Sequence, residues 1–125
     1  MPALYKKMND CYYFPSVYAQ KWFITLFAAY FPLKLVARIW DIYLVEGRKT
    51  IFRVALAIMK LNEDELMRAD QCRLFTIFDD YKGKVNSDQL LAMAFKSFTF
   101  SHKLIDELDK EYSNKPKDDI YQITN

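Results

Sequence analysis

Residues 18–47 decide the fold, and they read YAQKWFITLFAAYFPLKLVARIWDIYLVEG. Before Pro32, large apolar side chains recur at the three- and four-residue spacing of a helix, and a second apolar run follows it. Proline is tolerated in the first turn of a helix and forces the preceding residue, Phe31, out of helical geometry. Gly47 is suited to end the second run in a left-handed conformation. The stretch predicts two helices that meet at an angle at Pro32.

Helical spacing continues on both sides of this stretch. We expect a short helix over residues 3–9, a helix from Pro15 to about residue 30, and helices near 33–44 and 50–59. Shorter helices follow residue 60 and surround 74–78, Asn86 and Gln89 form a capping box for the next helix, and the last runs from about 101 to 112. The run 33–44 is apolar on nearly all sides, so we expect it inside the bundle.

This layout predicts an all-α fold, an irregular helical bundle. Only two glycines and four prolines are present, which leaves few tight turns for a multi-stranded sheet. We expect one structural unit over residues 1–114 and a frayed tail over 115–125.

Composition excludes several classes of function. The 125 residues are 52% hydrophobic, which argues against disorder, and 18 basic and 16 acidic side chains are mixed along the chain, which argues against a nucleic-acid partner. The uncharged stretch between Lys21 and Lys34 is shorter than the roughly 20 residues of a membrane-spanning helix. Cys11 and Cys72 have no metal-ligand spacing with the single histidine, so we expect no metal and no cofactor. Unpaired thiols are typical of a cytoplasmic protein.

The stretch 18–47 resembles the signature of the TBC domain, the all-helical module of Rab GTPase-activating proteins. That signature runs approximately Y-A-x-x-W-F-x-T-L-F-x-x-x-F-P-L-x-x-x-x-R-I-x-D-x-x-L-x-E-G, and the following IFRVALAIMKLNEDELMRAD and DELDKEY are also family-like. The resemblance covers about residues 3–114 and identifies the C-terminal half of the domain. It assigns structural roles to twelve residues: Tyr18, Trp22, Phe23, Leu26, Phe27, Phe31, Pro32, Arg38, Ile39, Asp41, Glu46 and Gly47.

In this family an arginine and a glutamine enter the nucleotide site of the Rab, where the arginine stabilises the transferring phosphoryl group and the glutamine orients water. Both lie in the N-terminal half of the domain, in the motifs I-x-x-D-x-x-R and Y-x-Q-G-M-N, and this chain contains neither motif. The resemblance therefore implies a scaffolding and Rab-docking half without catalytic residues, inactive alone. Its implied partners are a Rab-family GTPase and the N-terminal half of the domain, in the cytoplasm or peripherally on endomembranes. The alternative is an interaction module that binds a Rab or another membrane-traffic partner without accelerating hydrolysis.

Two motifs imitate functional sites. Gln20 completes a Y-x-Q sequence but is followed by Lys21, Trp22 and Phe23, so we interpret it as a surface residue of a helix. Residues 78–89, FDDYKGKVNSDQ, are reminiscent of a calcium-binding EF-hand loop, yet lysine and glutamine would occupy ligand positions. A turn between two helices is the simpler interpretation.

Arg38 and Asp41 are the next candidates, since they are charges on an apolar helix. Arg38 could reach a phosphate or a partner's carboxylate; we favour a structural ion pair between the two, or bonds to the loop near Glu46, because buried charges need partners. A set of aromatic residues could line a ligand pocket, but their helical spacing favours a place in the core: Trp22, Phe23, Phe27, Trp40 and Tyr43.

Overall fold

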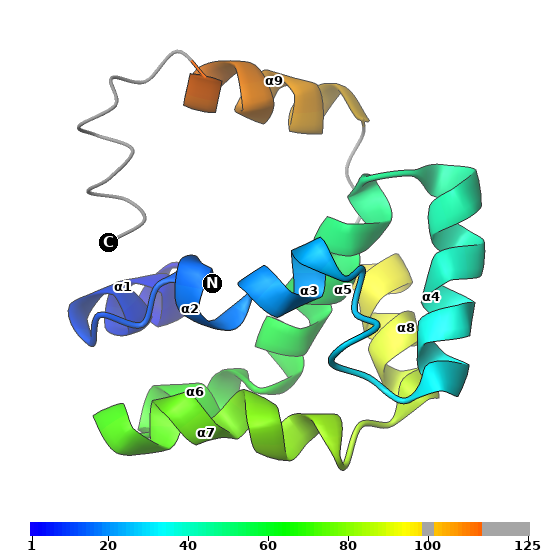
Figure 1. Ribbon diagram of the computed structural model, residues 1–125. Helices are drawn as coiled ribbons and strands as arrows, with labels where there is room; N and C mark the ends of the chain where they lie inside the picture. The colour runs from blue at the N-terminus through cyan, green and yellow to red at the C-terminus, as the bar shows by residue number, and fades with distance from the viewer. Residues whose placement is uncertain (99–101, 114–125) are drawn as a thin grey trace.

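The computed structural model describes residues 1–98 and 102–113, and every regular element in these residues is a helix (Figure 1). The all-α prediction is confirmed. The helices are α1 (Pro2–Asp10), α2 (Pro15–Tyr18), α3 (Gln20–Ile24), α4 (Leu33–Glu46), α5 (Lys49–Leu61), α6 (Glu63–Arg68), α7 (Gln71–Lys82), α8 (Ser87–Ser97) and α9 (His102–Ser113). The predicted tail, 115–125, lies outside the described residues.

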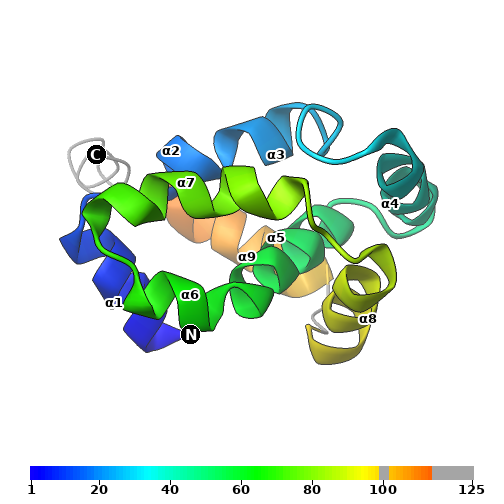
Figure 2. The ribbon, with the colours of Figure 1, turned by 90° about the horizontal axis from the view of Figure 1, so that it is seen from below.

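Helix α5 is the centre of the molecule. It packs most extensively against α8 and then against α4, and it also touches α3 and α6. Val54, Ala57 and Ile58 of α5 are completely buried. Figure 1 shows α4 and α8 on one side of α5 and α1 on the other, while α6 and α7 lie at its lower end. In Figure 2, α7 runs alongside α2 and α3 on one face of the bundle.

An aromatic cluster joins α3 to α7. Trp22, 1% exposed, contacts the ring of Phe78 edge-on at 5.2 Å between centroids, and Tyr18 contacts both rings. The hydroxyl of Tyr30 donates a hydrogen bond to the carbonyl oxygen of Phe78. Aromatic pairs in such geometries add about 0.5–1.5 kcal/mol each beyond their burial. The signature residues Tyr18 and Trp22 therefore build the core contact between the two segments.

The helix expected from Pro15 to residue 30 is interrupted. It is divided into α2 and α3, and turns follow from Thr25. Leu26 and Phe27 both have positive φ, 49° and 67°, which residues other than glycine seldom adopt. Phe27 is fully buried against Trp22 and Phe31, and its N–H donates to the carbonyl oxygen of Trp22 at 2.9 Å. Burial of this ring compensates for the backbone strain, which apolar spacing alone does not reveal.

Helix α4 also differs from its prediction. Its inner face is buried through Leu35, Val36 and Ile39, but Leu33 is 83% exposed and Leu44 is 81% exposed. The expectation that α4 lies inside the bundle is therefore wrong. The helix lies at the edge of the molecule because only α5 packs extensively along it (Figure 1).

The predicted ends of the helices are mostly confirmed. Pro32 caps α4 from just outside the helix, and Phe31 is not helical. Gly47 ends α4 with φ 77° and ψ −153°, a positive-φ region essentially restricted to glycine, although not the left-handed helical region. The side chain of Asn86 accepts a hydrogen bond from the N–H of Gln89 at 3.0 Å, as a cap of α8 should.

Candidate functional site

The twelve signature residues occupy three kinds of position. Trp22, Phe27, Phe31 and Ile39 are buried; Tyr18, Leu26, Glu46 and Gly47 are partly buried; Phe23, Pro32, Arg38 and Asp41 are exposed. Tyr18, Trp22, Phe27 and Phe31 are linked by successive ring contacts. Their structural roles in the family remain a prediction, but this distribution fits residues that shape a scaffold.

Arg38 and Asp41 are not paired with each other. The Arg38 guanidinium lies 3.0 Å from the carboxylate of Asp88 at the start of α8, and both side chains are largely exposed. The expected ion pair within α4 is therefore wrong, because Arg38 reaches across to a different helix. Such an exposed pair contributes at most about 1 kcal/mol.

Glu46 has a partner that the sequence did not indicate. Its carboxylate accepts a hydrogen bond from Arg53 of α5 at 3.0 Å, and the side chain of Arg53 is only 11% exposed. The guanidinium of Arg53 also lies 5.6 Å from the centre of the Phe95 ring on α8. Arg53 is the one charge within the apolar run 50–59, and that isolation was the available signal. This partly buried contact joins α4, α5 and α8.

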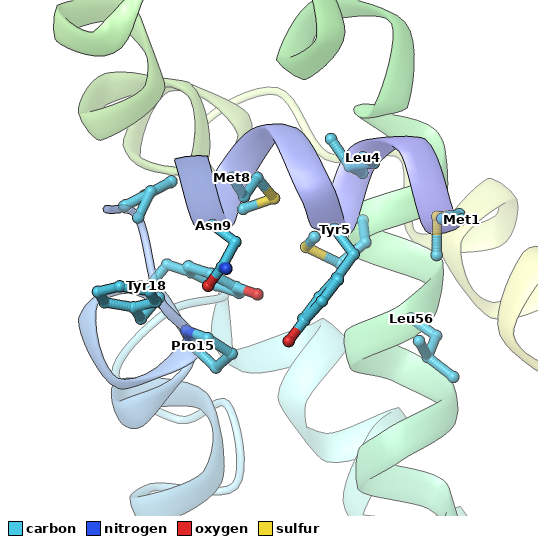
Figure 3. A pocket seen from close by; sticks show the side chains of 11 residues that line it. Met1, Leu4, Tyr5, Met8, Asn9, Pro15, Tyr18 and Leu56 are labelled. Atoms are coloured by element: carbon cyan, nitrogen blue, oxygen red, sulfur yellow. The ribbon is translucent and has the colours of Figure 1, made fainter. Parts of the chain in front are cut away.

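An apolar groove with a volume of about 300 Å³ lies between α1, α2 and α5 (Figure 3). The residues that line the groove are Met1, Leu4, Tyr5, Met8, Asn9, Tyr13, Phe14, Pro15, Tyr18, Leu56 and Met59. Apolar spacing placed Leu4 and Met8 on one face of the first helix but gave no indication that this face and α5 leave a groove between them.

The groove is apolar and uncharged. None of the eleven lining residues is charged, and none is a histidine or cysteine. Burial, with a smaller effect of Tyr5, raises the pKa of Tyr18 to about 12, so its hydroxyl stays protonated near neutral pH. The groove therefore offers apolar surface and a few hydrogen-bonding groups, and it contains no acid, base or nucleophile suited to catalysis.

Helix α9 is attached through Arg48, in the short connection between α4 and α5. The Arg48 guanidinium lies 2.5 Å from the carboxylate of Asp109 and 3.0 Å from that of Asp106. Ile105 of α9 is 5% exposed, whereas Leu104 and Leu108 are about half exposed. The two contacts of Arg48 thus link this helix to the connection.

The structure shows where the Y-x-Q sequence and the EF-hand-like sequence lie. Gln20 begins α3 and is exposed, as interpreted. Asp79 and Asp80 lie on α7, where they pair with Lys82 and Arg73 rather than converge on a loop. No group of potential metal ligands is found within residues 1–98 and 102–113. In that same part of the chain, no helix has the length and apolar character that a bilayer crossing requires.

Comparison with known proteins identifies one family model and several relatives. The family model described as the Rab-GTPase-TBC domain matches residues 1–67. The ecotropic viral integration site 5 protein homolog of Homo sapiens is 32% identical over 116 residues, and the Rab GTPase-activating protein eat-17 of Caenorhabditis elegans is 33% identical over 117. TBC1 domain family member 4 of Mus musculus is 42% identical over 67 residues.

These matches cover most of this chain but little of the relatives. The first two alignments span 90% and 92% of the chain, but only 14% and 13% of the respective relatives; the third spans 54% of the chain and 5% of the relative. No solved structure matches the chain.

Proposed function

Because this chain belongs to the Rab-GTPase-TBC domain family, we propose that it is the C-terminal part of a GTPase-activating domain for Rab-family small GTPases. In this proposal residues 1–114 scaffold the domain and help to dock the Rab, and an upstream half supplies the catalytic arginine and glutamine. The parent protein then acts in the cytoplasm or peripherally on membranes that carry its Rab.

The main support is the combination of family membership with missing catalytic motifs. The sequence contains neither I-x-x-D-x-x-R nor Y-x-Q-G-M-N. Gln20 and Arg38 are the residues that could replace them, but Gln20 begins α3 and Arg38 is paired with Asp88 of α8. An arginine finger in trans accelerates hydrolysis by about 10³–10⁵. A chain without this group should bind a Rab without comparable acceleration.

The apolar groove supports a packing role. Its walls are uncharged, and Tyr5 on its rim is 64% exposed. Met1 also lines the groove, so a segment joined to Met1 would leave from its rim (Figure 3). We assign the groove to contact with the upstream half of the domain, whose apolar side chains would bury these surfaces.

Single-turnover GTP hydrolysis on a panel of Rab proteins, with a binding assay on the same panel, tests the proposed function. We expect this chain alone to bind at least one Rab and to leave the hydrolysis rate within about twofold of the intrinsic rate. A longer chain that includes the upstream motifs should accelerate hydrolysis of the same Rab. Acceleration by this chain alone would contradict the division of labour, and binding without acceleration by the longer chain would identify a non-catalytic Rab-binding module.

Two exposed tyrosines provide a test of the groove. Tyr5→Asp places a carboxylate in the groove, whereas Tyr12→Asp changes a tyrosine that is 71% exposed and does not line it. In the longer chain, Tyr5→Asp should lower the melting temperature and the GTPase activation, because burial of an unpaired charge is costly. Tyr12→Asp should change neither. Equal effects of both substitutions would exclude the groove as the contact.

A further inference from the structure

Helix α4 carries an exposed apolar stripe. Leu33, Ala37, Trp40 and Leu44 are separated by four, three and four residues, and all four are exposed, with Leu33 at 83%, Trp40 at 42% and Leu44 at 81%. This spacing is the alternation of a helix that packs lengthwise against another helix. In Figure 1 the helix lies at the outer edge of the molecule, on the side of α5 opposite to α1.

The charges beside the stripe determine which helix it fits. Lys34 follows Leu33 and Asp41 follows Trp40, so the two charges lie seven residues apart on the same flank of the stripe. Both are exposed, and neither has an ion-pair partner within residues 1–98 and 102–113. A stripe bordered by one positive charge toward its start and one negative charge toward its end is complementary to a reversed copy of itself.

The register of the apolar residues agrees with that of the charges. In an antiparallel pair of α4 helices, Leu33 lies level with Leu44 of the second copy, and Ala37 lies level with Trp40 of the second copy. The same alignment brings Lys34 within about two residues, or roughly 3 Å along the axis, of Asp41 in the second copy. Twofold symmetry repeats each contact. A parallel pair would instead bring equal charges to the same level.

We propose that two copies of this chain associate through the stripe of α4 in an antiparallel, twofold-symmetric pair, with Lys34 of each copy facing Asp41 of the other. The interface consists of one short helix from each copy. The surface area that such an interface buries is smaller than in most permanent dimers. The dimer is therefore weak, with an expected Kd of about 10–500 µM. The proposal is independent of any activity toward a Rab.

Variants that reverse the charges of Lys34 and Asp41 test whether a second copy covers the stripe and whether the pair is antiparallel. The dimer Kd of each variant is measured by sedimentation equilibrium over a range of concentrations. Lys34→Asp or Asp41→Lys alone should raise the Kd about 5- to 30-fold, because each creates two repulsive contacts. The double variant Lys34→Asp with Asp41→Lys should restore the original Kd within about threefold. Single variants without effect, or a double variant that is as weak as the singles, would overturn the antiparallel pair.

The apolar part of the interface has a matched control. Leu44→Gln should raise the Kd at least about tenfold, because it removes one leucine from each copy's stripe. Val45→Gln changes an equally exposed residue, 85% against 81%, one position off the stripe and should have little effect. Both variants should keep the original helical circular dichroism and melting temperature, since neither side chain is buried.

The same variants, made in a longer chain that includes the upstream half, show whether the stripe of α4 is covered by a second copy or by that upstream half. We expect the longer chain to dimerise with a similar Kd and to lose dimerisation with Leu44→Gln. The proposal is overturned if this chain stays monomeric up to about 1 mM, or if the longer chain is monomeric and Leu44→Gln lowers its melting temperature. The second result would mean that the upstream half covers the stripe.

Discussion

Gly47 shows how a single residue determines the path of the chain. It ends α4 at φ 77° and ψ −153°, and α5 begins two residues later at Lys49. A Cβ atom at this backbone conformation is strained whatever space surrounds it. The glycine therefore allows the sharp reversal that places α4 and α5 side by side.

Substitution of the two glycines in the chain should have different consequences. Gly47→Ala should lower the free energy of unfolding by about 1–3 kcal/mol, measured by urea denaturation. Gly83 has φ −84°, and a Cβ added there would lie 3.7 Å from the nearest atom. Gly83→Ala should therefore be neutral or stabilise by up to about 1 kcal/mol. A loss at Gly83 as large as the loss at Gly47 would disprove the role of backbone conformation.

Two arginine ion pairs provide a second comparison. Arg53→Met should lower the free energy of unfolding by about 1–2 kcal/mol, because Arg53 is buried, bonds Glu46 and lies over Phe95. Arg38→Met should change it by less than about 0.5 kcal/mol, since both Arg38 and Asp88 face solvent. The same denaturation series measures both variants. The reverse order would mean that the surface pair, not the buried one, joins α4 to the bundle.

At the level of elements, the sequence predicted regular helices better than the turns between them. The apolar spacing around residues 50–59 correctly indicated α5, and Asn86 with Gln89 correctly indicated the start of α8. The break between α2 and α3 was missed, because Trp22 and Phe27 are five residues apart and their burial requires a left-handed turn rather than a longer helix. Tertiary packing, not local propensity, determines this segment.

Helix α9 should depend on Arg48 and on ionic strength. Arg48→Gln removes contacts to Asp106 and Asp109, so backbone amides of residues 102–113 should exchange with deuterium faster while those of α5 keep their rate. High salt should have a similar effect on the original chain. Lys103→Gln is the control, because the contact of Lys103 with Glu107 lies within α9. Unchanged exchange in Arg48→Gln would mean that apolar contacts alone hold α9.

At the scale of the whole molecule, the site was less predictable than the fold. Signature residues such as Trp22 could be located from spacing, and of the aromatic residues expected in the core, Trp22 and Phe27 are buried and Tyr43 is partly buried. Phe23 and Trp40, 39% and 42% exposed, are not. The groove and the stripe of α4 arise from how helices that are distant in sequence are placed, and composition does not contain that information.

The buried tyrosines should make the whole chain sensitive to alkali. Burial raises the pKa of Tyr18 and Tyr81 to about 12, compared with about 10 in an unfolded chain, and it also raises the pKa of Tyr13 and Tyr30. The unfolded state therefore loses these protons first, so the stabilisation present below pH 10 is lost as pH rises toward 12. Melting temperatures followed by circular dichroism should fall across this range.

Tyr18→Phe separates this effect from general alkaline damage. The substitution keeps the aromatic ring and removes one of the titrating hydroxyls, so the alkaline decrease in melting temperature should become shallower. The stability near neutral pH should change little, because no hydrogen bond of the Tyr18 hydroxyl is found among the described residues. An unchanged slope would show that Tyr18 does not contribute to the pH dependence.

The two tryptophans provide intrinsic fluorescence probes of two different environments. Trp22 is 1% exposed in the core, whereas Trp40 is 42% exposed on the outer edge of α4. Core indole emits at shorter wavelength and is shielded from dissolved quenchers such as iodide or acrylamide, whereas indole in water is not. Anything that covers α4 should therefore shield Trp40 and leave the emission of Trp22 unchanged, while unfolding should expose both. Tryptophan fluorescence alone can thus distinguish a chain bound to a partner through α4 from an unfolded chain.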